Sequence, residues 1–151
     1  MKVKPDPVFA LHRYYIWANL MRTHFDTAAL ASPGSDLWSK DSIETTAYIS
    51  YWYAGLYVVV SGWRRLRLRD AAIDTMLQDL EMVALLERYR HGVFHFHPEY
   101  VDERFQGFLT KGAESARWAR DLNRELGRFF LEYLQQQKAT RAEGGQDGQA
   151  R

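Results

Sequence analysis

The residue types best suited to chemistry lie together between Arg88 and His97. This segment reads RYRHGVFHFH and contains three of the five histidines of the chain. Histidine titrates near neutral pH, so its imidazole can take a proton from one group and return it to another. Arginine keeps its charge and can bind two oxygens of a phosphate at once. The segment therefore predicts proton transfer beside a bound phosphate group.

A helix over this segment would separate polar from apolar residues, since successive side chains are about 100° apart around the axis. The apolar side, which we expect to face the core, carries Leu86, Tyr89, Val93 and Phe96. The opposite side carries Arg88, His91 and His95, and the edges carry Arg90 and His97. The charged and imidazole groups are therefore expected to face solvent or another chain.

The stretch Arg90-His91-Gly92-Val93-Phe94-His95 resembles the R-x4-6-H signature of HEPN domains, an all-α family named for nucleotide-binding domains of higher eukaryotes and prokaryotes. In that family a polar residue usually follows the arginine, as His91 does here, and the motif lies late in a helical bundle. The resemblance in helical organisation covers roughly residues 7–136. Some toxin-type members carry a tyrosine two residues after the histidine, where this chain has His97.

The resemblance implies a metal-independent endoribonuclease, of a family that includes toxins and phage-defence effectors. Its site would form where two protomers bring their motifs together across a two-fold axis, with RNA as substrate, an antitoxin or other regulatory protein as a further partner, and no cofactor. His95 would be the general base and Arg90 would stabilise the phosphate, with Arg88, His91 and His97 as auxiliary residues. Attack by the 2′-hydroxyl would give a 2′,3′-cyclic phosphate and a 5′-hydroxyl.

The spacing of the two main residues poses a geometric question. On a regular helix Arg90 and His95 are about 140° apart, so they cannot both face one phosphate. Either Gly92 loosens the helix, or a second chain completes the site. Arg88, which shares a face with His95, would then be the more useful arginine.

Two other functions fit the same residues. In the first, the chain is a non-catalytic HEPN-like binding or assembly module, and its histidines are surface or interface groups. In the second, a helical-bundle hydrolase holds a metal through Glu87, His91 and His95, which recur at i, i+4 and i+8. His12 or His24 could add a ligand, although no Glu-x-x-His pair recurs on a second helix, as a di-iron bundle would require.

Two further clusters allow both a functional and a structural interpretation. Arg64, Arg65 and Arg67 could hold RNA phosphates near the motif, but cations at the end of a helix also complement its dipole, which we favour. The second cluster is aromatic and consists of Tyr48, Tyr51, Trp52, Tyr53 and Tyr57. We expect it to form core or dimer interface rather than to stack on bases.

The composition of the whole chain indicates its class and excludes some kinds of site. The chain has 151 residues, 46% of them hydrophobic, and a net charge of +1, as expected of one folded domain. It has no cysteine, which excludes disulfides, thiolate catalysis and zinc fingers. The N-terminal residues contain no apolar signal segment, so we expect a cytoplasmic location. The uncharged stretch Thr45–Trp63 could span a bilayer, but its Tyr, Ser and Thr content favours a core helix and no membrane partner.

Helix signals occur throughout, and they predict an all-α, HEPN-like up-down bundle of four or five helices. Its domain covers residues 1–137, and residues 138–151 form a disordered tail. Asp6-Pro7 starts a helix to Ala29, and the stretch Ala31–Asp36 is a loop. A second helix begins with a capping box at Asp41 and ends near Leu68. The remaining helices are expected from Asp70 to Pro98, from Pro98 to Leu109, and after Gly112.

Overall fold

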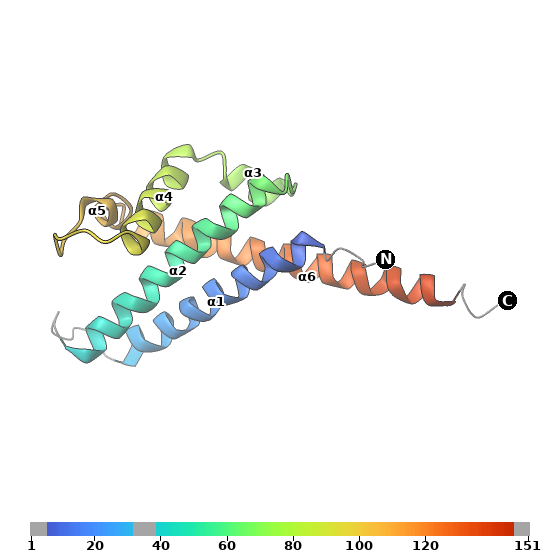
Figure 1. Ribbon diagram of the computed structural model, residues 1–151, viewed down its shortest axis with the longest axis horizontal. Helices are drawn as coiled ribbons and strands as arrows, with labels where there is room; N and C mark the ends of the chain where they lie inside the picture. The colour runs from blue at the N-terminus through green and yellow to red at the C-terminus, as the bar shows by residue number, and fades with distance from the viewer. Residues whose placement is uncertain (1–5, 32–38, 147–151) are drawn as a thin grey trace.

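The computed structural model describes residues 6–31 and 39–146, with side chains described through Ala142, and these residues form six α-helices and no strand (Figure 1). The helices are α1 (Pro7–Ala31), α2 (Lys40–Arg65), α3 (Ala71–Met76), α4 (Leu80–Phe94), α5 (Glu103–Thr110) and α6 (Ala113–Gln146). The all-α prediction is confirmed. The predicted number of four or five is wrong by at least one, because the third predicted helix is divided into α3 and α4.

Side-chain caps explain where the first two helices begin. Asp6 precedes α1, and its carboxylate accepts a hydrogen bond of 2.9 Å from the Val8 backbone N–H, as the sequence predicts. The cap of α2 is Ser39, whose hydroxyl oxygen accepts a bond of 3.1 Å from the Ser42 N–H. The predicted cap at Asp41 is therefore wrong by two residues. The predicted loop after Ala31 lies outside the described residues.

A break between α3 and α4 interrupts an otherwise regular apolar pattern. Asp70 caps α3 as predicted, but the helix ends at Met76, and the carboxylate of Asp79 then accepts from the Met82 N–H to begin α4. Leu77 lies in the break and is only 7% exposed. Because the turn keeps the apolar side chains on the core side, the spacing alone does not reveal it.

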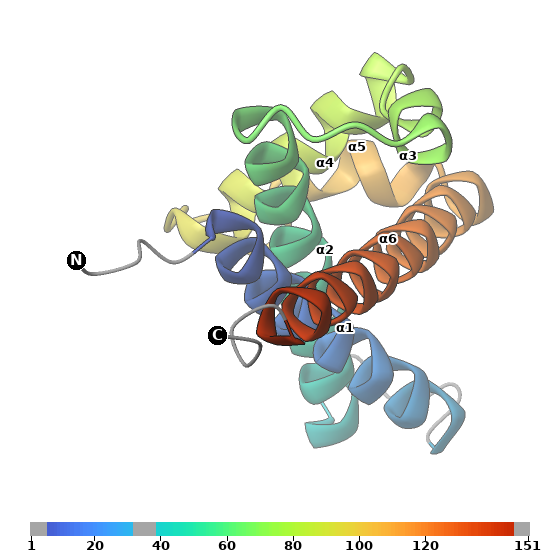
Figure 2. The same ribbon diagram turned by 90° about the vertical axis from the view of Figure 1, so that its right-hand side faces the viewer.

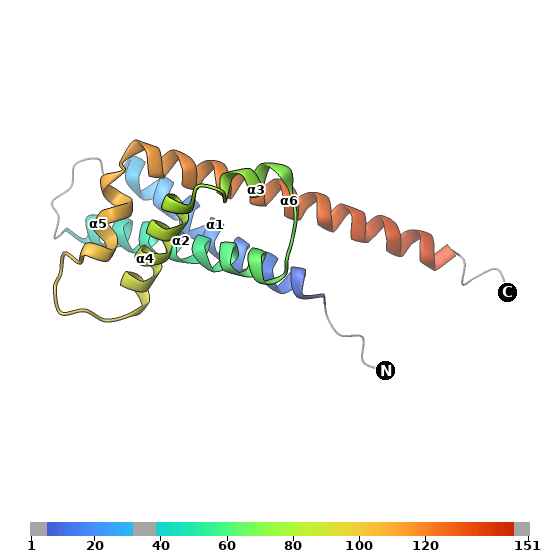
Figure 3. The same ribbon diagram turned by 90° about the horizontal axis from the view of Figure 1, so that it is seen from above.

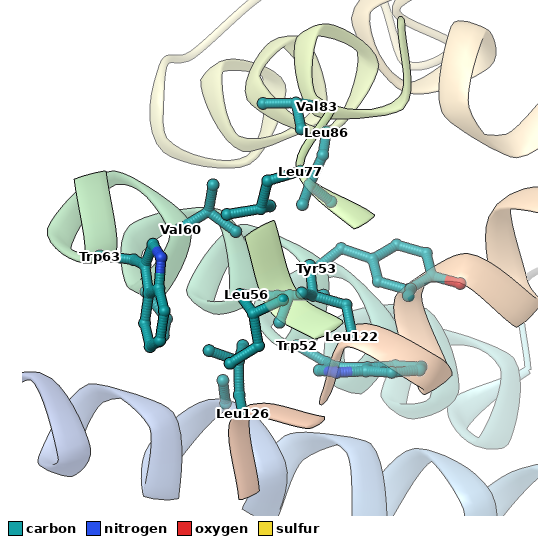
Figure 4. Packing of buried hydrophobic residues seen from close by; sticks show 14 of the residues in the cluster. Trp52, Tyr53, Leu56, Val60, Trp63, Leu77, Val83, Leu86, Leu122 and Leu126 are labelled. Atoms are coloured by element: carbon teal, nitrogen blue, oxygen red, sulfur yellow. The ribbon is translucent and has the colours of Figure 1, made fainter. Parts of the chain in front are cut away.

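Helix α2 is the centre of the core, and α1 lies along it (Figures 1 and 3). Two glycines allow the close approach of these helices. A Cβ on Gly55 would lie 3.0 Å from the Ala18 Cβ, and one on Gly62 would lie 2.3 Å from the Leu11 Cδ1. The other sides of α2 bury large side chains against α4 and α6, as Figure 4 shows for Trp52 and Tyr53.

The aromatic cluster of α2 is divided between core and surface. Trp52 is fully buried and its indole N–H donates to the Asn123 side-chain oxygen at 3.3 Å, and Tyr53 is also buried. Tyr51, in contrast, is about half exposed. Among the described residues no helix combines the length and the apolar character that crossing a membrane requires.

Helix α6 extends beyond the other helices at its C-terminal end (Figure 1), and the view toward that end shows α3, α4 and α5 grouped on one side of it (Figure 2). It continues to Gln146, so the disordered tail predicted from Lys138 is wrong for residues 138–146. Gln, Lys, Ala and Arg in this part favour continuation of an existing helix even without an apolar stripe. Residues 147–151 lie outside the described residues.

Candidate functional site

Helix α4 ends before the last two histidines of the predicted motif. His95 is its C-cap, with an extended backbone at φ −120° and ψ 117°, and its N–H donates to the His91 carbonyl at 3.0 Å. The helical positions expected for later residues therefore do not apply. Leu86 and Tyr89 are buried as predicted, but Phe96 is 95% exposed, so the expectation that it faces the core is wrong.

An arginine from the next helix closes the end of α4. Arg104 on α5 donates to the carbonyl oxygens of His91 at 3.4 Å and His95 at 3.3 Å. Its Nε donates to Asp102 Oδ2 at 2.8 Å, and a second guanidinium nitrogen bonds the same carboxylate. The carbonyl groups that a helix end leaves without partners are thus bound by a side chain distant in sequence.

Asp102 anchors the same turn from the other side. It caps α5 by accepting a bond of 2.9 Å from the Arg104 backbone N–H, and its side chain is only 4% exposed. The bonds from Arg104 lower the pKa of this carboxyl to about 2. His97 Nδ1 lies 3.9 Å from Asp102 Oδ2. Sequence reasoning missed Asp102 and Arg104 because it placed the start of this helix at Pro98. An Asp just before the apolar pair Phe105 and Phe108 is the signal that could have located the cap.

Gly92 has a packing role. A Cβ at this position would lie 2.8 Å from Cε1 of Phe105, so glycine lets α5 approach α4 closely. The ring of Phe105 in turn packs edge-on against buried Tyr89, with centroids 5.0 Å apart. Helix α4 runs without interruption through Gly92, so of the two alternatives for Arg90 and His95, the one in which this glycine loosens the helix is wrong.

The structure brings two of the predicted residues into contact. The rings of His91 and His95 have centroids 5.6 Å apart and are perpendicular, and both side chains are exposed. Arg88, also exposed, lies three residues before His91 on α4 and so on the same face. Within one chain this face presents two imidazoles and a guanidinium to solvent, which suits proton transfer beside an anion.

Arg90 turns toward a different part of the molecule. Its guanidinium carbon lies 6.0 Å from the centre of the Phe94 ring, and its buried Nε has no hydrogen-bond partner among the described residues. The charge of Arg90 also affects the pKa of the Tyr57 hydroxyl on α2. Burial and a hydrogen bond to Glu87 raise the pKa of the Tyr57 hydroxyl, and the charges of Arg64 and Arg90 oppose this. Within one chain Arg90 therefore contacts Phe94, whereas His95 contacts His91.

The ligands expected for a metal site do not come together in the described part of the chain. The Glu87 carboxylate accepts a hydrogen bond from the Tyr57 hydroxyl. In the described part of the chain, no group of three or more His, Asp or Glu side chains is arranged to hold a metal ion. His12 packs against Phe130, with ring centroids 5.1 Å apart and a pKa lowered by burial. His24 stacks on Tyr48 at 5.2 Å. The two histidines of α1, which were only possible additional ligands, therefore contact aromatic rings instead.

The arginines at the end of α2 lie apart from the histidine pair. Tyr51 of α2 contacts Phe94, the last residue of α4, with ring centroids 6.1 Å apart. The end of α4 therefore lies beside Tyr51. Arg64 is 13 residues further along α2, which is about 20 Å along the axis. Figure 3 shows the end of α2 near α3, away from the junction of α4 and α5. Arg64, Arg65 and Arg67 therefore do not lie beside His91 and His95.

An exposed apolar groove begins at Phe94. It has a volume of about 370 Å³ and continues along α1 and α2 past Tyr51 and Trp17, each about half exposed. Arg13 lies over the Trp17 ring, 5.2 Å from its centre. Sequence reasoning assigned Tyr51 to an aromatic cluster but did not separate it from its buried neighbours.

Comparison of the chain with protein-family models, with curated proteins and with solved structures gives no match. A function can therefore be argued only from the residues and their geometry.

Proposed function

We propose that this protein is a metal-independent endoribonuclease of HEPN type that acts as a homodimer. The observation that carries the proposal is the exposed pair of His91 and His95, with ring centroids 5.6 Å apart, beside Arg88. In the reaction, His95 removes the proton of a ribose 2′-hydroxyl and the 2′-oxygen attacks phosphorus. The bond from phosphorus to the 5′-oxygen breaks, and protonated His91 gives its proton to that oxygen. Arg88 binds the charged phosphate oxygens.

Dimerisation gives Arg90 a role that it does not have within one chain. Its guanidinium carbon lies 6.0 Å from the centre of the Phe94 ring, and no hydrogen bond or ring contact joins it to His95 among the described residues. Phe94 and Tyr51 are each about half exposed and provide apolar surface that a second copy would cover. Across such an interface Arg90 would approach a phosphate held by the other chain. In a toxin or defence setting, a regulatory protein would bind the same face.

The test is cleavage of a labelled RNA in EDTA by the wild type, His95→Ala and His24→Ala. His24 is a matched control, because it is an exposed histidine outside the candidate site. We expect His95→Ala to lose about 10²–10⁴-fold in rate, and His24→Ala to keep the wild-type rate. Products with a 2′,3′-cyclic phosphate, together with a dimeric mass in solution, would support the full proposal. Equal cleavage by all three proteins would reject it.

A second candidate is a non-catalytic binding or assembly module, and the apolar groove favours it. The groove exposes aromatic rings of three helices and lies next to Arg90. Large exposed apolar surface of this kind marks interaction sites. A wild-type chain that is inert on several RNAs and self-associates through Trp17 and Tyr51 would support this module over the nuclease.

A further inference from the structure

Helix α2 ends in a left-handed turn that carries an arginine in place of glycine. The Arg67 N–H donates to the Arg64 carbonyl at 3.1 Å, and the Leu68 N–H donates to the Trp63 carbonyl at 3.2 Å. Arg67 has a φ of 54°. Helices that end with this pair of bonds usually have glycine at the left-handed position, because a side chain disfavours that conformation. The arginine at position 67 is therefore not explained by the turn.

The turn forms one wall of a hollow between α2 and α3, about 290 Å³ in volume. The residues that line it are Trp63, Arg64, Arg67, Leu68, Arg69, Asp74, Leu77 and Gln78. Three arginines and one aspartate thus line the same hollow. Positive side chains gathered around one hollow repel each other, and an anion bound between them would relieve that repulsion.

The partners of these side chains leave positive charge available. Arg64 donates to the Leu77 carbonyl at 3.4 Å, and Arg67 makes no ion pair or side-chain hydrogen bond among the described residues. Arg69 lies 3.9 Å from Asp74 and its side chain is 85% exposed. The Asp74 carboxylate already accepts bonds from the Trp63 indole N–H at 3.1 Å and the Asp70 N–H at 3.3 Å.

Complementation of the α2 dipole explains only part of the cluster. Arg64 and Arg65 lie in the last turn of the helix, where cations are favourable. Arg67 and Arg69 lie beyond the helix end, and Arg67 adopts a disfavoured backbone conformation. One guanidinium can donate two parallel hydrogen bonds to two oxygens of a phosphate. A hollow of this volume is also large enough for a phosphate group.

We propose that this hollow, lined by Arg64, Arg67 and Arg69, is a binding site for a phosphate group. The phosphate can belong to a nucleic-acid strand or to a small free anion, and the two sources share the same chemistry. The inference does not depend on the proposed cleavage, because its residues lie on α2, α3 and the turn between them.

The test uses the full chain and two phosphate sources. A labelled single-stranded DNA provides a phosphate backbone that lacks the 2′-hydroxyl, so cleavage cannot affect the measurement, and inorganic phosphate provides the free anion. Binding of DNA is followed by fluorescence anisotropy over a series of salt concentrations, and binding of phosphate by calorimetry. The variants are Arg67→Gln and Arg64→Gln, with Arg117→Gln as a control that removes an exposed arginine on α6.

We expect each of the two substitutions to weaken binding about tenfold, and to reduce the slope of log affinity against log salt by about 0.7. Arg117→Gln should bind as the wild type does, and Arg67→Lys should recover part of the affinity. If the variants lose affinity for DNA only, the ligand is the backbone of a strand. If they lose affinity for inorganic phosphate as well, the hollow is a site for the free anion. Wild-type binding by the Arg67 and Arg64 variants, or no binding by the wild type, would overturn the proposal. Neither result would bear on RNA cleavage by His91 and His95.

Discussion

The ends of α2 and α4 solve the same problem in different ways. At α2, the backbone N–H groups of Arg67 and Leu68 bond the last carbonyls, so the nearby guanidiniums remain available. At α4, Arg104 comes from another helix to bond the carbonyls of His91 and His95, and its charge is shared with Asp102. The way in which a helix end is closed thus determines which side chains near it are free for function. At α2 these are arginines, and at α4 they are histidines.

The two ends also differ in what they depend on. The turn after α2 is closed by hydrogen bonds between residues that are close in sequence. The end of α4 needs α5 in place, which in turn needs Gly92 to leave room for Phe105. We therefore expect substitutions to affect the end of α4 through packing and the end of α2 through backbone conformation.

The largest effect should separate the core of α4 from the residues beyond its end. Leu86 is fully buried, so Leu86→Ala should lower the free energy of unfolding by about 2–5 kcal/mol through the cavity it leaves. Phe96 is 95% exposed, so Phe96→Ala should change it by less than about 0.5 kcal/mol. Urea unfolding measures both. A large loss with Phe96→Ala would show that α4 continues as the apolar spacing suggests.

The second effect tests the contact between α4 and α5. Gly92→Val should lower the free energy of unfolding by about 1–3 kcal/mol, because the new side chain overlaps the Phe105 ring. Ala84→Val is the matched control, since Ala84 is exposed on the same helix and the change carries the lower helix propensity of valine without the overlap. The comparison uses denaturant unfolding of both variants. Equal losses would mean that α5 does not rest on Gly92.

The third effect has opposite signs at neighbouring positions of the α2 end. Arg67→Gly should raise the free energy of unfolding by about 1 kcal/mol, because glycine adopts the left-handed backbone without the steric clash that a side chain causes. Arg65→Gly lies within the last helical turn and should lower it by about 0.5–1 kcal/mol. Thermal unfolding of both variants tests this. The stabilised Arg67 variant should at the same time bind phosphate less tightly than the wild type, and a stabilised variant with full affinity would separate the turn from the proposed site.

The smallest effect depends on pH and concerns the α4 end. The pKa of Asp102 in the folded protein is about 2, below its ordinary value of about 3.8. A lowered pKa stabilises the fold above the unfolded pKa, and this stabilisation is lost as pH falls from about 4 toward 2. Asp102→Asn should therefore differ from the wild type most above pH 4, and the difference should shrink in acid. Unfolding midpoints measured at several pH values give this difference. A constant difference from pH 7 to pH 2 would contradict the lowered pKa.

Much of the helical framework could be predicted from local signals. Asp6 and Asp70 are side-chain caps at the predicted positions, and α1 and α2 follow closely from the sequence. The break before α4 could not be predicted from periodicity, because Leu77 stays buried across it. The end of α4 could not be predicted either, because it is closed by Arg104, whose position depends on the tertiary fold.

The candidate site divides in the same way. The exposure of Arg88 and His91 follows from helical spacing, because both lie inside α4. His95 and His97 lie outside the helix, so the spacing does not place them, and only the folded turn brings His95 against His91. The guanidinium of Arg90 lies over the Phe94 ring. The sequence alone does not show that Arg90 contacts this ring rather than another neighbour.

The projecting end of α6 gives the molecule a gradient of local stability. Tyr133 ties this helix to the start of α1, through its ring contact with Phe9 at 6.2 Å and its hydroxyl, which donates to the carboxylate of the capping residue Asp6. The side chains of residues 138–142 are exposed, so their backbone amides lie in a part of the helix that frays readily. Amide hydrogens near Leu126 should therefore exchange with solvent slowly, through global unfolding, and those after Lys138 rapidly, through local opening. The one polypeptide would then show two exchange regimes along one continuous helix.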